Sequence, residues 1–191
     1  MIAFNYSEIY FPLKDEIGYP WYELDWLELQ LEELIAVDLI IRTVNSDNRI
    51  SNLFVFPEVA LLGSAFNICF ELVQIIKMNE ERTAALCDAR YYLYMELMED
   101  KTLKLSSYTI LSPPTTESGY FKKHPTNPEF EMRTIYVNWD DFVLAALSYQ
   151  RQAYCEAAAV IPELQDHPDW SQEYYNILER EAILMDSLQK R

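Results

Sequence analysis

The chain has 191 residues, of which 31 are Asp or Glu and 15 are Lys or Arg, so its formal charge at pH 7 is −16. Half of its residues are hydrophobic and only three are glycine, which argues against a disordered chain and against a glycine-rich phosphate loop. The negative charge also argues against direct binding to nucleic acid or anionic lipid, and it favours a cationic partner.

The first half of the sequence predicts strands. Residues 2–11 are aromatic and β-branched with partial alternation, which indicates a strand. Residues 21–34 fit both a strand and a helix, whereas residues 35–43 are strongly β-prone. Residues 50–56 predict another strand that ends at Pro57. The short connection predicts that these last two strands pair antiparallel.

The middle of the sequence predicts one helix, a second hairpin and a long loop. Residues 59–77 carry apolar side chains at helical spacing, so we expect a buried helix. After a polar break, residues 89–97 alternate and residues 102–110 return in phase, which predicts an antiparallel hairpin. Residues 111–131 contain four prolines and one glycine and predict an irregular loop. Residues 132–137 predict a short strand.

Two helices are expected at the C-terminal end, over residues 139–161 and 169–189. Asn138 with the following aspartates resembles a capping box for the first helix, and Gln172 is a box candidate for the second. We therefore expect a single domain over residues 1–191 of the α+β class. It would have a mainly antiparallel sheet of about 5–7 strands packed by three helices, with the two C-terminal helices longest.

No residue pattern predicts metal binding or nucleophilic catalysis. His124 and His167 each precede a proline in an expected solvated loop, and the sequence contains neither HExxH nor closely spaced Cys and His pairs. Cys69, Cys87 and Cys155 are odd in number and widely spaced, so we expect buried, reduced thiols. A catalytic Cys–His pair that meets only in space is the alternative. We expect no enzymatic activity, no cofactor and no metal.

The strongest candidate for a partner-binding site is the acidic, aromatic segment over residues 21–33. Trp and Tyr are favoured anchors in protein interfaces, and the acids between them would orient a basic partner. The competing interpretation is that the aromatic side chains build the core while the acids face water. The candidate residues are Trp21, Glu23, Asp25, Trp26, Glu28, Glu32 and Glu33.

A second candidate is the basic and aromatic cluster within the expected loop. One short cluster is a weak electrostatic footprint in an acidic chain, so its competing interpretation is a solvated loop tip. The residues are Tyr120, Phe121, Lys122 and Lys123.

Location is inferred from targeting signals. The N-terminal residues show no signal-peptide pattern, and no stretch of roughly 18 uncharged apolar residues predicts a membrane span. We therefore expect a cytoplasmic protein without membrane contact.

The order of elements carries a family resemblance. The hairpin VDLIIRTVNSDNRISNLFVFP precedes one helix, the hairpin YYLYMEL…TLKLSSY follows, and RTIYVNWDDFVLAAL leads into a long helix. In this organisation the chain resembles the small acidic α+β immunity proteins of bacterial polymorphic and contact-dependent toxin systems. The resemblance implies a role, the neutralisation of a toxin, but no site residues, because these families share no fixed functional residues.

The leading hypothesis is a non-enzymatic protein that masks the active cleft of a basic, nuclease-type toxin. A related version is an acidic mimic of nucleic acid that blocks a nucleic-acid-binding protein. The alternatives from other classes are an enzyme with a carboxylate-only site and a structural subunit of a permanent oligomer. The expected partner is a cationic protein, with no direct contact to nucleic acid.

Overall fold

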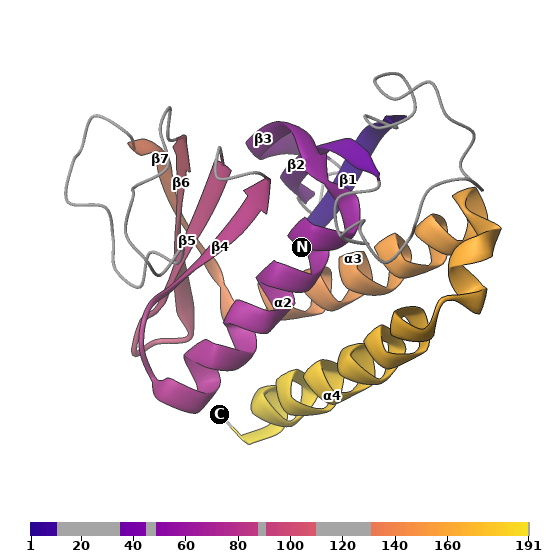
Figure 1. The fold of residues 1–191 in the computed structure, drawn as a ribbon. Coiled ribbons are helices and arrows are strands. Elements are labelled where there is room, and N and C mark those ends of the chain that lie inside the picture. Colours follow the sequence, from indigo (N-terminus) through magenta and orange to yellow (C-terminus); the bar gives the residue numbers. More distant parts are fainter. Residues whose placement is uncertain (11–34, 45–48, 88–90, 110–130, 191) are drawn as a thin grey trace, which may run out of the picture.

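The computed structural model describes residues 1–10, 35–44, 49–87, 91–109 and 131–190. In these residues, seven strands form two antiparallel sheets, with the orders β1-β2-β3 and β4-β5-β6-β7, and three α-helices lie along one side of them (Figure 1). The α+β class and the antiparallel pairing therefore agree with the sequence. The expected single sheet is wrong, because the chain leaves the first sheet through an 18-residue helix that carries it roughly 27 Å before the second sheet begins.

The first sheet follows the predicted alternation. Its strands are β1 (Ile2–Tyr10), β2 (Ala36–Val44) and β3 (Ile50–Ala60). Val37, Leu39 and Ile41 are completely buried, and the residues between them are partly exposed, as expected for a strand with one face on the core. The predicted hairpin of β2 and β3 is confirmed. The predicted end at Pro57 is wrong: β3 continues past this proline, which a strand tolerates where the proline nitrogen is not needed for pairing.

The second sheet contains the predicted second hairpin. Its strands are β4 (Arg82–Cys87), β5 (Tyr91–Leu97), β6 (Thr102–Thr109) and β7 (Glu131–Asn138). The hairpin of β5 and β6 and the strand β7 confirm the sequence analysis. Strand β4 was not predicted, because its two alanines and its polar start give weak alternation. It becomes a strand through pairing with β5.

The helices begin and end close to the predicted positions. They are α2 (Leu61–Met78), α3 (Trp139–Val160) and α4 (Pro168–Lys190), with the short 3₁₀ helix η4 (Pro162–Asp166) between the last two. Their lengths of 18, 22 and 23 residues differ little, so the expected predominance of the two C-terminal helices is slight.

The starts of α3 and α4 are capped by side chains. The Asn138 side chain accepts a hydrogen bond from the Asp141 amide at 3.1 Å, which confirms the predicted cap of α3. The predicted role of Gln172 is wrong, because its side chain donates to Asn176. Instead, His167 Nδ1 accepts from the Asp169 amide at 3.2 Å, so His167 caps α4 rather than being a solvated loop histidine.

One hydrophobic core joins both sheets to the helices. Trp139, Phe142 and Tyr149 are buried side chains on α3. Phe4 of β1 stacks on Tyr149 with ring centroids 5.2 Å apart, so the first sheet is fixed directly to α3. Arg133 of β7 donates to the backbone carbonyl oxygens of Asn52 and Leu53 in β3, which ties the second sheet to the first.

Helix α2 lies at the centre of this arrangement. By length and composition alone it is apolar enough to cross a membrane, although the sequence analysis expected no such segment. Within the fold 67% of it is buried, as is usual for the core helix of a globular protein. It therefore packs against strands of both sheets and against both C-terminal helices.

Candidate partner-binding site

Both sites predicted from the sequence lie outside the described residues. The acidic and aromatic set from Trp21 to Glu33 falls within residues 11–34, and the basic cluster from Tyr120 to Lys123 falls within residues 110–130. The described residues contain a different acidic surface, which we call the acidic groove.

The acidic groove opens where the C-terminal end of α2 meets the tip of the β5–β6 hairpin. Its volume is about 580 Å³. Sequence reasoning missed it, because both of its acidic segments were interpreted as turns, and no local signal places the end of a helix beside a hairpin almost twenty residues later. Its lining residues are Ile75, Asn79, Glu80, Glu81, Glu96, Leu97, Met98, Glu99 and Lys101.

Two tight turns build the walls of the groove. Asn79 has φ 54° and ψ 44°, and its amide donates to the Ile75 carbonyl at 2.9 Å, which ends α2 with a left-handed cap. This cap turns the chain toward β4 and places Glu80 and Glu81 in the lining. At the tip of the β5–β6 hairpin, the Met98 amide donates to the Thr102 carbonyl at 2.8 Å and closes the hairpin.

Asp100 stabilises the hairpin tip. Its carboxylate accepts a hydrogen bond from the Thr102 amide at 3.0 Å, while Lys101 adopts a positive φ of 61°. The hydrogen bonds with Thr102 hold the pKa of Asp100 below its ordinary value. The tip therefore adds an acid that is ionised at neutral pH beside Glu99.

The electrostatic balance of the groove is negative. Among the described residues, the side chains of Glu81 and Glu99 make no ion pair and no hydrogen bond. The free carbonyl groups at the C-terminal end of α2 add partial negative charge. The other charged side chains in the groove lining are compensated, in the pairs Glu80–Arg82 (3.6 Å), Glu96–Lys104 (2.9 Å) and Lys101–Asp140 (3.2 Å).

The spacing of the carboxylates distinguishes between kinds of cation. Within the described part of the chain, no three His, Cys, Asp or Glu side chains converge closely enough to hold a metal ion. The groove carboxylates instead come from two segments, Glu80 and Glu81 before β4 and Glu96 and Glu99 at the end of β5 and the hairpin tip. This arrangement fits ammonium and guanidinium groups, which are held by separate hydrogen bonds to several oxygens.

Exposed methionines accompany the acids. Met98 lines the groove and Met78 directly precedes the helix cap, and both side chains are largely exposed. Unbranched thioether side chains adapt to irregular apolar surfaces and are common on binding surfaces. The groove thus combines charge with apolar contacts of the kind that a protein partner would bury.

A buried carboxyl lies behind the wall formed by β4. Glu71 of α2 is only 7% exposed, and burial raises its pKa to about 7, an effect that the positive charge of Arg82 opposes. Arg82 also pairs with Glu80 and donates to the Met78 sulfur. Arg82 therefore connects the buried carboxyl with the edge of the groove.

The cysteines show no sign of nucleophilic chemistry in the described residues. Cys69 is completely buried as expected, and burial raises its thiol pKa to about 12. A thiol with this pKa stays protonated at neutral pH and is a poor nucleophile. Cys155 is exposed, so its expected burial is wrong: it lies on the side of α3 opposite the buried Ala153. The structure does not describe the side chain of Cys87.

Comparison with known proteins assigns no relative. No protein-family model matches the chain, and no curated protein and no solved structure matches it significantly.

Proposed function

We propose that this chain is a non-enzymatic protein that neutralises a basic protein, in the way that an immunity protein masks the active cleft of a nuclease-type toxin. The observation that carries the proposal is the acidic groove, in which Glu81 and Glu99 have no ion pair and no hydrogen bond among the described residues and the exposed Met98 lies in the same lining. The formal charge of −16 supports the same partner class.

The mechanism would proceed in two steps. The field of the whole chain steers a cationic surface toward the groove, which raises the association rate at low ionic strength. Lysine or arginine side chains of the partner then pair with Glu81 and Glu99, while Met78 and Met98 pack against apolar parts of the partner. A nuclease cleft presents such cations because it binds phosphate. Occupying them would block access of nucleic acid.

The groove is tested by charge reversal with a matched control. In the double variant Glu81→Lys/Glu99→Lys, each substitution adds two charges, so the formal charge rises by four. The control Glu179→Lys/Asp166→Lys makes the same change at exposed acids outside the groove. Binding of a labelled oligoarginine peptide, and of the basic protein encoded beside this chain if one is present, is measured by fluorescence anisotropy.

We expect the groove variant to bind at least about 10-fold more weakly than the control variant, because local ion pairs are lost in addition to the general field. Circular dichroism checks that both variants are folded, as expected for surface substitutions. Equal weakening in both variants would mean that only net charge matters and that the groove is not the site.

A further inference from the structure

The antiparallel pair of helices α3 and α4 presents an apolar face that the acidic groove does not involve. Residues three, four or seven positions apart share one side of a helix. Four apolar side chains on this side, two of them leucines, are between 43 and 49% exposed. We call this surface the helix-pair face; it consists of Leu144, Arg151 and Cys155 of α3 and Tyr174, Leu178, Glu181 and Met185 of α4.

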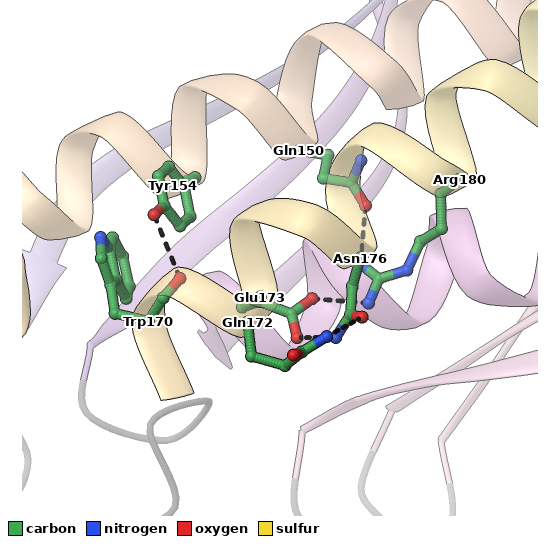
Figure 2. A network of polar contacts seen from close by, with 7 residues as sticks. All are labelled: Gln150, Tyr154, Trp170, Gln172, Glu173, Asn176 and Arg180. Atoms are coloured by element: carbon green, nitrogen blue, oxygen red, sulfur yellow. Dashed lines mark hydrogen bonds and ion pairs between the residues drawn. The ribbon is translucent and has the colours of Figure 1, made fainter. Parts of the chain in front are cut away.

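A groove of about 560 Å³ forms one end of the helix-pair face. The rings of Tyr154 and Trp170 stack at its base with centroids 4.1 Å apart, and the Tyr154 hydroxyl donates to the Trp170 carbonyl at 3.2 Å (Figure 2). Ala158 and Ala159 leave room on the α3 side, and Tyr174 borders the α4 side. Small residues next to rings offer a depression for apolar side chains of another molecule.

Arg151 and Glu181, the two charged residues named in the helix-pair face, form an ion pair with each other. The Arg151 guanidinium binds the Glu181 carboxylate through two nitrogens, with Nη2 at 2.6 Å from Oε2. The Arg151 side chain is 69% exposed, whereas Glu181 is 8% exposed. A bidentate pair of this kind can be covered without leaving an unpaired charge in the interface, so this charge does not prevent the face from being buried.

We infer that the helix-pair face is the contact between two copies of this chain. The charge of the face favours a second copy of the chain over a cationic partner. The chain carries −16 in total, whereas the named residues of the helix-pair face carry one cation and one anion, and Asp141, three residues before Leu144 on the same side of α3, pairs with the N-terminal ammonium at 3.6 Å. A cationic partner therefore gains nothing here, whereas two like-charged copies repel each other least where neutral faces meet. In an isologous contact, the two helix pairs would form a four-helix layer related by a two-fold axis.

The size of the surface is consistent with this contact. The four exposed apolar side chains leave on the order of 400 Å² of apolar surface, which is comparable to the largest patch on a typical monomer. A stable interface buries about 800 Å² on each partner, and its rim is polar. The apolar centre therefore supplies about half of this area, and the exposed Arg151 and the polar residues around it would form the rim.

The oligomeric state of the full chain tests the inference. Sedimentation velocity and light scattering are measured at about 100 μM protein and about 1 M NaCl, where the Debye length of about 3 Å removes most of the repulsion between copies. The variants are Leu178→Glu on α4 and Leu144→Glu on α3. Val55→Glu on β3 is the control, because Val55 is equally exposed, lies outside the face and receives the same charge.

We expect a dimer for the wild type and for Val55→Glu, and at least a 10-fold weaker dimer for both leucine variants. Salt should strengthen this dimer but weaken oligoarginine binding to the acidic groove, so the two proposals fail independently. A wild type that stays monomeric under these conditions overturns the inference. So does a dimer that both leucine variants leave unchanged, since the contact would then lie elsewhere.

Discussion

At the scale of single residues, Glu71 shows how the fold changes an ordinary side chain. Its carboxyl is buried between α2 and the second sheet, and removal from water raises its pKa to about 7. The positive charge of Arg82 partly offsets this rise in pKa, but Arg82 also forms an ion pair with Glu80 at the acidic groove. The folded protein therefore binds a proton between pH 4.5 and about 7 that the unfolded chain releases.

This difference predicts a pH dependence of stability. Because the pKa of Glu71 is higher in the folded state, its favourable contribution is complete below pH 4.5 and is lost as the pH rises through about 7. Replacing Glu71 by Gln removes the titration but keeps the shape. Urea unfolding should show that the wild type loses up to about 3 kcal/mol relative to Glu71→Gln between pH 5 and pH 8. Parallel stability curves for the two proteins would contradict the assignment.

At the scale of elements, a polar network fixes α4 to the other helices. Arg180 donates to Gln150 of α3 at 2.9 Å and to Glu173, about two turns earlier in α4, at 2.5 Å (Figure 2). Its guanidinium carbon also lies 5.3 Å from the centre of the Phe66 ring of α2. Asn176 donates to the second oxygen of Glu173 at 2.9 Å. One guanidinium thus connects three helices, which keeps the helix-pair face in a fixed geometry.

Removal of this guanidinium should loosen α4. Arg180→Met keeps an apolar stem over Phe66 but leaves Glu173 Oε1 and Gln150 Oε1 without the donor that Arg180 supplies, so we expect a loss of about 2–3 kcal/mol in unfolding free energy. Lys77→Met, which removes an exposed positive charge, should cost less than about 1 kcal/mol. Adding Glu173→Leu to Arg180→Met should recover part of the lost unfolding free energy, because no carboxylate is then left unpaired. If the double variant loses the sum of the free energies lost in the two single variants, Arg180 and Glu173 are not coupled.

At the scale of the whole molecule, the charge of −16 opposes folding as well as attracting a partner. Raising NaCl from about 0.01 M to about 1 M shortens the Debye length from about 30 Å to about 3 Å. The melting temperature should therefore rise by roughly 5 °C, which corresponds to one to three kcal/mol for a chain of this size. Chloride is used instead of sulfate, because sulfate strengthens apolar burial by itself. A melting temperature that is independent of salt would show that the acids are compensated within the fold.

Local sequence patterns determined much of the secondary structure. Alternation placed β2 and the hairpin of β5 and β6, helical spacing placed α2, and Asn138 was identified as the cap of α3. These features depend on residues close together in the chain, where side-chain period and backbone capping act directly. The net charge and its implication for a cationic partner are likewise properties of composition.

Tertiary structure decided the rest, because it depends on contacts between distant residues. Strand β4 exists through its pairing with β5, and Pro57 is accommodated within β3 despite its local preference. The acidic groove needs Glu81 and Glu99 in one lining, and the helix-pair face needs two helices side by side. The exposure of Cys155 and the raised pKa of Glu71 depend on which side of each helix packs against other elements. The tertiary fold decides this packing, and the local sequence does not.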